Sequence, residues 1–321
     1  KKMAKDPVLA IAVPCYNEAE LIKSTTDRLL QVLYDLEKKE KISDKSYIYL
    51  VDDGSKDNTW LEIGYSVARN PNKIKACKFS TNFGNQKALL AGLLEAKKIG
   101  CDAVVTIDAD LQQDENKIEE FIEKYDEGNK IVFGIRKDRK TDDFFKKTSA
   151  LAFYKVMDLN GVKIPKNHSD YRLVSSEVLD VLEKFCESEL FLRGFFHEIG
   201  FRKAIVYFDV KPRKIGKSKF NFFSLFALAA HGITSYSVVP LKMICIMGFL
   251  TMLFGFLTGI WAIVAKFVWH SSPDGWTEAM IITSFFGGFE VFCIGIVAEY
   301  LGQIFREVKK RPRYLIEQEL L

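Results

Sequence analysis

The feature that most constrains this chain is a long uncharged segment in its C-terminal third. Residues 243–265, MICIMGFLTMLFGFLTGIWAIVA, contain no charged side chain. As a helix this segment would be about 35 Å long, which exceeds the roughly 30 Å hydrocarbon core of a bilayer. A second apolar segment, residues 279–305, follows after a short loop and carries Glu290 and Glu299. The sequence therefore predicts two transmembrane helices, about residues 241–267 and 279–303, that form a hairpin.

Basic segments flank this hairpin on both sides. KPRKIGKSK precedes it and REVKKRPR follows it, whereas the connecting loop HSSPDGW contains no Lys or Arg. Because cytoplasmic flanks are enriched in Lys and Arg, we expect a multi-pass protein of the plasma membrane whose N-terminal part is cytoplasmic. The aromatic segment at residues 220–237 is expected to lie in the membrane interface, with a core helix of the soluble part as the alternative.

These patterns divide the chain into four parts. We expect a cytoplasmic α/β domain over residues 1–212, juxtamembrane interfacial helices over 213–237, the two transmembrane helices within 238–305, and a basic cytoplasmic tail over 306–321. The six cysteines are scattered without a C-x-x-C motif or a close Cys/His cluster. This argues against a zinc site or a disulfide framework and fits a reducing compartment.

The N-terminal part alternates short apolar runs with helical patterns. The expected strands cover residues 8–14, 47–53, 74–80, 103–109, 130–135 and 204–210. Amphipathic helices are expected between them, one with Asn17 and Glu20 as a capping box and others ending at Gly100 and Gly128. Strands that alternate with helices and are apolar on both faces indicate a mostly parallel sheet, covered on both sides.

Three of these strands end in polar clusters, VPCYNE, VDDGSKD and TIDADLQQD. In a parallel sheet these ends lie along one edge, where ligands bind. The Gly-rich motifs G-x-G-x-x-G and G-x-x-x-x-G-K-[ST] are missing, so a nucleotide would need another means of binding its phosphates, for which a divalent metal held by acids is the candidate. Asp108 and Asp110 would point the same way from an extended backbone and suit Mg²⁺ or Mn²⁺. Asp114 is expected to be the N-cap of the next helix.

The motifs VPCYNEAE, VDDGSKDNT, NFGNQKALLAGL and IDADLQQD, in this order and spacing, resemble family 2 glycosyltransferases with a GT-A-type fold. With GIRKDR, DYRLVS, RKIGKSKF and the hairpin, the chain is most similar to polyprenyl-phosphate glycosyltransferases. These include dolichyl-phosphate mannose synthases and bacterial enzymes that glycosylate undecaprenyl phosphate. The resemblance covers essentially the whole chain. It implies a Rossmann-like GT-A catalytic domain, a UDP-sugar donor, a polyprenyl phosphate acceptor and Mg²⁺ or Mn²⁺ as cofactor.

The resemblance also implies roles for individual residues on the donor side. The expected donor-binding residues are Pro14, Tyr16, Asn17, Glu18, Asp52, Asp53, Lys87, Asp108 and Ala109. The expected metal ligands are Asp108 and Asp110, with Gln112. The alternative for Glu18 is a helix-dipole acid, and for Asp52 and Asp53 it is a turn.

On the acceptor side the resemblance implies that Asp170 and Arg172 are catalytic. The expected acceptor-phosphate residues are Arg136, Arg213, Ser218 and Lys219. A lipid phosphate is already ionised near neutral pH, so it needs cationic binding and in-line positioning rather than a strong base. The alternative for the basic residues is surface charge or contact with anionic lipid. For Asp170 it is an ion pair that orients Arg172.

The expected reaction is an inverting transfer of a hexose, glucose or N-acetylglucosamine, to the lipid phosphate through an oxocarbenium-like state. One alternative is a processive membrane polysaccharide synthase, although its Q-x-x-R-W motif is missing. Another is a non-enzymatic scaffold that binds nucleotide sugars at the membrane. Glu290 in the second span suggests a functional role or a partner, with a protonated structural Glu as the alternative. Small residues at 285–289, FFGGF, favour a homo-oligomer through the membrane region, and no nucleic-acid partner is expected.

Overall fold

A computed structural model describes residues 6–137, 168–187, 190–210, 244, 246–250, 253, 257 and 276–321. The chain divides into two units. The first contains residues 1–155, 163–219 and 312–321, and the second contains residues 156–162 and 220–311. The last ten residues therefore belong to the α/β unit, although they follow the second unit in the sequence.

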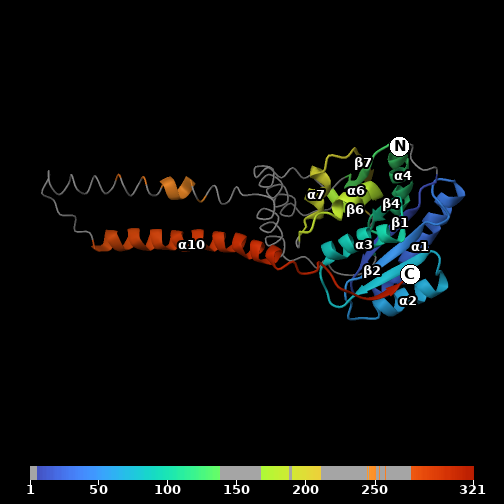
Figure 1. The fold of residues 1–321 in the computed structure, drawn as a ribbon, viewed down its shortest axis with the longest axis horizontal. Helices are drawn as coiled ribbons and strands as arrows, with labels where there is room; N and C mark the ends of the chain where they lie inside the picture. The colour runs from blue at the N-terminus through green and yellow to red at the C-terminus, as the bar shows by residue number, and fades with distance from the viewer. Residues whose placement is uncertain are drawn as a thin grey trace. The chain divides into compact units, whose positions relative to one another are not determined.

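The described part of the first unit is built on an eight-stranded sheet (Figure 1). The strand order is β7 (Lys203–Phe208), β5 (Ile131–Arg136), β6 (His168–Ser175), β4 (Ala103–Thr106), β1 (Leu9–Cys15), β2 (Tyr47–Asp52), β3 (Ile74–Phe79) and β8 (Ile316–Leu320). The strands β4, β1, β2 and β3 are parallel to one another, and β5 is parallel to β7. Only β6 and β8 pair antiparallel within this described sheet. The predicted α/β fold with a mostly parallel sheet is confirmed, but neither antiparallel strand was predicted.

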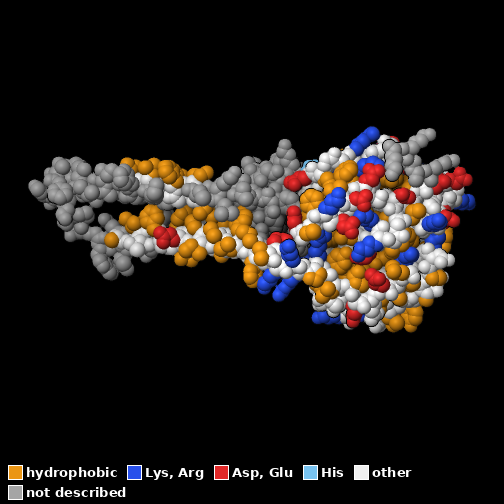
Figure 2. Space-filling model, in the orientation of Figure 1, with side chains coloured by type: hydrophobic (Ala, Val, Ile, Leu, Met, Phe, Trp, Pro, Cys, Tyr) orange, Lys and Arg blue, Asp and Glu red, His pale blue; other side chains and the backbone are white. Residues whose placement is uncertain are grey.

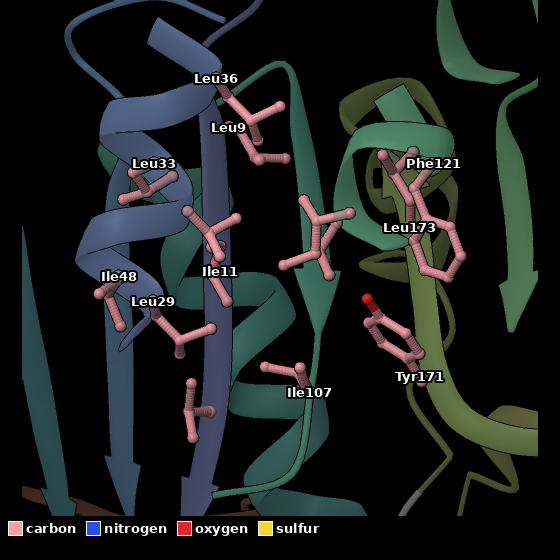
Figure 3. Packing of buried hydrophobic residues seen from close by; sticks show 14 of the residues in the cluster. Leu9, Ile11, Leu29, Leu33, Leu36, Ile48, Ile107, Phe121, Tyr171 and Leu173 are labelled. Carbon is pink, nitrogen blue, oxygen red and sulfur yellow. The ribbon is translucent and has the colours of Figure 1, made fainter. Parts of the chain in front are cut away.

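Helices cover both faces of this sheet because successive side chains of a strand point to opposite faces. Leu9, Ile11 and Val13 of β1 pack with α1 (Ala19–Lys38), α2 (Thr59–Arg69) and α4 (Ile118–Asp126). Figure 3 shows part of this cluster. On the other face, Ala10 and Ala12 pack with α3 (Asn85–Ile99), α6 (Ser176–Leu182) and α7 (Leu192–Glu198).

The ends of the helices test several local predictions. Gly100 is the left-handed C-cap of α3, and Gly128 has a φ of 95° just after α4. Asp114 is the N-cap of the short 3₁₀ helix η1 (Glu115–Lys117) that leads into α4, as predicted. The prediction of a capping box at Asn17 and Glu20 was wrong, because the N-cap of α1 is Glu18 and its side chain makes no capping hydrogen bond. Asn17 instead accepts a hydrogen bond from the backbone N–H of Lys56 at 2.9 Å.

The C-terminal residues form an edge of the sheet. Strand β8 pairs antiparallel with β3, with Leu320 opposite Ala76 and Ile316 opposite Phe79. The sequence analysis assigned residues 306–321 to a basic tail and expected no strand there. The reason is tertiary: the edge of β3 offers a row of backbone donors and acceptors, and the segment IEQEL pairs with them.

The second unit contains α10 (Trp276–Val308). Within the described parts of the chain, no helix is both long enough and apolar enough to cross a membrane. The predicted hairpin is therefore not confirmed, and most of its first span and all of residues 213–237 lie outside the described residues. Large hydrophobic side chains, among them Val291, Ile294, Leu301 and Phe305, are exposed along α10 (Figure 2).

Candidate active site

The three predicted polar clusters lie at one edge of the sheet. Parallel strands β4, β1 and β2 are neighbours, and their carboxyl ends are Thr106, Cys15 and Asp52. In this register Thr106 lies opposite Ala12 and Cys15 opposite Asp52. Residues from positions 14–18, 52–57 and 108–114 therefore come together, as expected for a parallel sheet.

The acidic pair lies in a turn rather than on a strand. Strand β4 ends at Thr106, and the N–H of Leu111 bonds to the carbonyl oxygen of Asp108 at 3.2 Å. The prediction that an extended backbone aligns Asp108 and Asp110 was therefore wrong. The turn is held by the buried hydroxyl of Thr25 on α1, which donates to the carbonyl oxygen of Ala109 at 2.6 Å.

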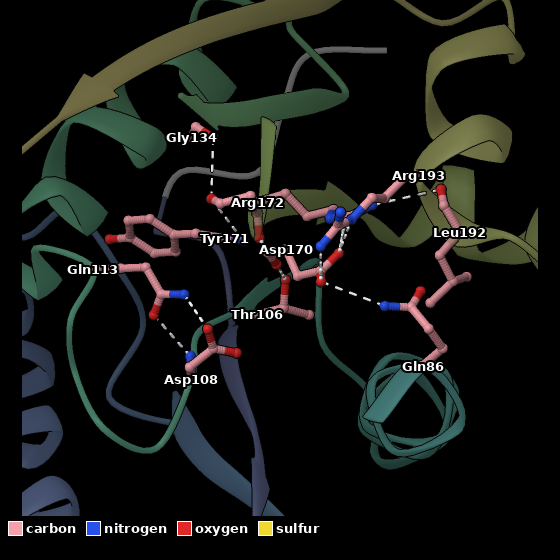
Figure 4. Close-up of polar contacts among 11 residues, drawn as sticks. Gln86, Thr106, Asp108, Gln113, Gly134, Asp170, Tyr171, Arg172, Leu192 and Arg193 are labelled. Atoms are coloured by element: carbon pink, nitrogen blue, oxygen red, sulfur yellow. Dashed lines mark hydrogen bonds and ion pairs between the residues drawn. The ribbon is translucent and has the colours of Figure 1, made fainter. Parts of the chain in front are cut away.

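Gln113 fixes the Asp108 side chain. Its Oε1 accepts a hydrogen bond from the N–H of Asp108 at 3.0 Å, and its Nε2 donates to Asp108 Oδ2 (Figure 4). Gln112, the predicted metal ligand, donates its backbone N–H to Asp110 Oδ1 at 3.2 Å. The sequence motif offered two adjacent glutamines, and only the fold distinguishes the buried Gln113 from its neighbour.

Negative charge accumulates around Asp108. Burial raises the pKa of Asp108 to about 6, and the negative charges of Asp170 and Asp110 also raise it. The hydrogen bond from Gln113 and the positive charge of Arg136 act in the opposite direction. A divalent cation would relieve this repulsion, and hard carboxylate oxygens suit Mg²⁺ or Mn²⁺. The described residues include no group of three or more His, Cys, Asp or Glu that could hold a metal. Asp108 and Asp110 are the two carboxylates that this turn itself offers to a cation.

Asp170 is held beside Asp108 by the pairing of β4 with β6. The hydroxyl of Thr106 donates to the carbonyl oxygen of Asp170 at 2.5 Å. The Asp170 carboxylate accepts hydrogen bonds from Nε and Nη2 of Arg193 at 3.1 and 2.8 Å, and from Nη2 of Arg172 (Figure 4). Arg193 lies on α7, outside the DYRLVS motif; the sequence placed it near Asp170 in the pocket that selects the sugar but gave it no catalytic or binding role.

Arg172 is 2% exposed, and its guanidinium lies over the ring of Phe196 at 5.1 Å. Burial lowers the pKa of Arg172 to about 10, although the negative charge of Asp170 raises it and so favours the protonated guanidinium. The geometry matches the alternative interpretation of this pair, in which Asp170 and Arg172 orient each other. Arg193 is the more accessible of the two arginines, with 33% of its side chain exposed.

Gln86, in the first turn of α3, completes this cluster. Its Nε2 lies 3.4 Å from Asp170 Oδ2, which fixes the orientation of the amide because a carboxylate only accepts hydrogen bonds. Its Oε1 is buried, and no partner is present among the described residues. A buried carbonyl oxygen without a donor is costly, so a ligand hydroxyl beside Asp170 would satisfy it.

The two aspartates after β2 have different surroundings. Asp53 accepts hydrogen bonds from the backbone N–H groups of Phe83 and Gly84 at 2.7 and 2.9 Å. Asp52 is 0% exposed and accepts from the N–H of Ser55 at 3.1 Å, while its Oδ2 is buried without a partner in the described structure. Burial raises the pKa of both carboxyls. Asp53 thus holds the loop before α3, whereas one oxygen of Asp52 has no partner among the described residues.

The other predicted donor residues border the same edge. Pro14 and Tyr16 are half-buried at the end of β1, and the N–H of Glu18 donates to Thr59 Oγ1 at 2.9 Å. Lys87 lies in the first turn of α3, where its charge favours the ionised form of Asp53. Of the predicted acceptor-phosphate residues, Arg136 ends β5 close enough to affect Asp108. The others lie outside the described residues: Arg213, Ser218 and Lys219.

Together, the sheet and its acidic turn define a glycosyltransferase of the GT-A type. The chain belongs to glycosyl transferase family 2, whose model matches residues 10–182. It is 45% identical to the uncharacterized glycosyltransferase YkoT of Bacillus subtilis (strain 168), over 98% of this chain and 92% of that protein. It is 35% identical to the bactoprenol glucosyl transferase of Shigella phage SfII, over 97% of each chain.

More distant matches are found among solved structures. One is the mannosyltransferase PcManGT from Pyrobaculum calidifontis in complex with GDP-Man and Mn²⁺, with 17% sequence identity and a TM-score of 0.46. The match covers 96% of this chain and 89% of that chain.

Proposed function

We propose that this enzyme transfers a hexose from a UDP-sugar to undecaprenyl phosphate or a related polyprenyl phosphate. Glucose is the first candidate for the hexose, and N-acetylglucosamine is the second. The observation that carries the proposal is the Asp108–Asp110 turn with Asp170 held beside it by two arginines. Full-length similarity to a bactoprenol glucosyl transferase supports a lipid phosphate as acceptor and glucose as the sugar.

The donor would be bound across the carboxyl ends of β1, β2 and β4. The unpaired Oδ2 of Asp52 suits the imide N–H of uracil, and Tyr16 offers a ring face to the base. The diphosphate would lie at Asp108 and Asp110. The hexose attached to it would then approach Asp170 and the unpaired Oε1 of Gln86.

Asp108 and Asp110 are the residues that would hold Mg²⁺ or Mn²⁺. When bound, such a metal neutralises the diphosphate and favours its departure. Gln113 and Thr25 position this pair of carboxylates, because they hold Asp108 and the turn around Ala109. A bound metal would also favour the ionised form of Asp108, whose pKa is raised by burial and by the neighbouring acids.

The acceptor phosphate would approach Asp170 and Arg193 from the side of Arg136. Arg136 supplies positive charge at the end of β5, and we propose Arg213, Ser218 and Lys219 as further phosphate contacts. Because the phosphate arrives ionised, no strong base is required. Asp170, engaged by two guanidinium groups, is suited to orienting the arginines and the sugar during an in-line, inverting displacement.

A polyprenyl phosphate acceptor requires access to a membrane. The exposed hydrophobic side chains of α10 support association of the second unit with lipid. The two membrane spans, the cytoplasmic orientation and the homo-oligomer remain sequence predictions.

The test is a transfer assay with purified full-length protein, undecaprenyl phosphate and a panel of UDP-sugars. We expect a singly glycosylated lipid with β configuration, dependent on Mg²⁺ or Mn²⁺, and loss of at least about a hundredfold in rate in Asp108→Asn, the range typical of losing an electrostatic stabiliser. Mass spectrometry identifies the sugar. An α-linked product refutes inversion, products with several sugars favour a processive synthase, and donor binding without UDP release favours a scaffold.

A further inference from the structure

The last residues of the chain reach the loop that precedes α3. The backbone N–H of Ser80, just after β3, donates to the carbonyl oxygen of Leu315 at 3.0 Å. Beside it, β8 extends the sheet, and Lys78 forms an ion pair with Glu317 at 3.3 Å. The C-terminal segment, residues 314–320, is therefore fixed along the strand that leads into residues 81–84.

A row of aromatic rings extends from this segment to that loop. The ring of Tyr314 stacks on Phe79, with centroids 5.2 Å apart, and Phe79 contacts the edge of Phe83 at 5.6 Å. The hydroxyl of Tyr314 donates to Oε1 of the buried Glu95 on α3 at 2.8 Å. Tyr314 thus contacts both the strand before the loop and the helix after it.

The same loop is part of the donor site. Phe83 and Gly84 donate their backbone N–H groups to the two carboxylate oxygens of Asp53. Gly54 packs so closely on Thr81 that a Cβ atom there would lie 2.4 Å from a backbone carbon. Asp53 and Gly54, which directly follow Asp52, therefore both contact this loop, so a shift of the loop would be transmitted to the backbone that carries Asp52.

We propose that Tyr314, at the start of the C-terminal segment, is a positioning residue for the nucleotide end of the donor site, acting through Phe79 and the loop at residues 81–84. The inference rests on the proposed function for the identity of the donor. It gives Tyr314 a role in donor affinity, whereas β8 serves to extend the sheet. A change that removes the Tyr314 ring weakens nucleotide binding without altering the chemistry of the transfer.

The experiment compares Tyr314→Ala, Tyr314→Phe and Gln318→Ala in the full-length protein. Gln318 is the matched control, since it lies on β8 in the same C-terminal segment and its Oε1 accepts a hydrogen bond from Trp60 Nε1 at 2.7 Å, away from the aromatic row. We expect Tyr314→Ala to weaken binding roughly three- to tenfold, the range for loss of one aromatic pair. Tyr314→Phe keeps the ring and stays within about twofold of wild type, and Gln318→Ala leaves affinity unchanged.

Calorimetry with UDP and GDP measures affinity, and steady-state kinetics separates KM for the donor from kcat. Thermal melting checks that each variant is folded at the assay temperature, and Phe83→Leu provides a second disruption of the row if Tyr314→Ala does not fold. Unchanged affinity in a folded ring-deleted variant, or equal losses in Tyr314→Ala and Gln318→Ala, overturns the inference. A wild-type protein that binds nucleotide but does not glycosylate the lipid refutes the proposed function and leaves this test valid.

Discussion

Arg193 on α7 holds Asp170 on β6 through two hydrogen bonds, from Nε at 3.1 Å and from Nη2 at 2.8 Å. This fork-shaped contact fixes the plane of the carboxylate, because both oxygens are engaged by one rigid group. The contact brings Arg193 and Asp170, which belong to different elements of the chain, together beside the acidic turn. The contact explains how Asp170, whose side chain is only 8% exposed, keeps one orientation.

We expect Arg193→Lys to lower kcat roughly tenfold to a hundredfold, because hydrogen bonds to charged groups contribute about 1.5–3 kcal/mol each and Lys cannot form the paired contact. The measurement is steady-state transfer to lipid phosphate, with thermal melting as a check of folding. Arg69→Lys, at the exposed end of α2, is the control and should behave as wild type. Equal activity of the two variants would show that the contact is dispensable.

Asp52→Asn and Asp53→Asn should separate recognition from positioning. Asp53→Asn removes one acceptor from the loop at Phe83 and Gly84, and we expect a loss of about 1–3 kcal/mol in the free energy of unfolding. Asp52→Asn can keep the bond from Ser55 but replaces the unpaired oxygen with a donor. It should leave stability near wild type and weaken UDP binding. Urea unfolding and calorimetry measure the two effects, and identical profiles would contradict this division.

The raised pKa of Asp108 predicts a pH dependence of stability in the metal-free protein. Between the usual pKa of an Asp and about 6, the folded state keeps a proton that the unfolded state has lost. The contribution of Asp108 to the free energy of unfolding therefore falls as the pH rises through this window. Above about pH 6 the destabilisation is complete and no longer changes with pH. We expect the free energy of unfolding of Asp108→Asn to exceed that of wild type by more at pH 7.5 than at pH 5. Urea unfolding in the presence of EDTA measures this difference, and the opposite ordering contradicts the prediction.

Thr25 offers a test of the turn that carries the acidic pair. Thr25→Val removes the hydroxyl that bonds to Ala109, and an unpaired buried carbonyl costs about 1–3 kcal/mol. We expect lower stability and a higher metal concentration for half-maximal activity. Thr25→Ser keeps the hydroxyl and should retain the metal response of wild type. If both variants respond to metal alike, the hydroxyl does not position the turn.

Much of the sheet could be predicted because its signals are local. The apolar runs of β1, β2, β3, β4, β5 and β7 and the glycines after α3 and α4 are visible within a few residues of sequence. Strand β6 was missed because HSDYRLVS begins with polar residues, and β8 because IEQEL has no clear alternation. Both strands pair antiparallel with strands that are distant in the chain. Whether these residues form a strand therefore depends on the partner strand and not on their own sequence.

By itself, the sequence determined the α/β alternation, the edge of the sheet that carries the site, and the pair Asp108 and Asp110, since these follow from periodicity and from the ends of parallel strands. Tertiary structure alone decided which glutamine holds Asp108, which aspartate holds the loop before α3, and which arginine is accessible at Asp170. The physical reason is that hydrogen bonds and burial depend on atoms brought together by the strand order. No local pattern records which distant residue will fill a given position.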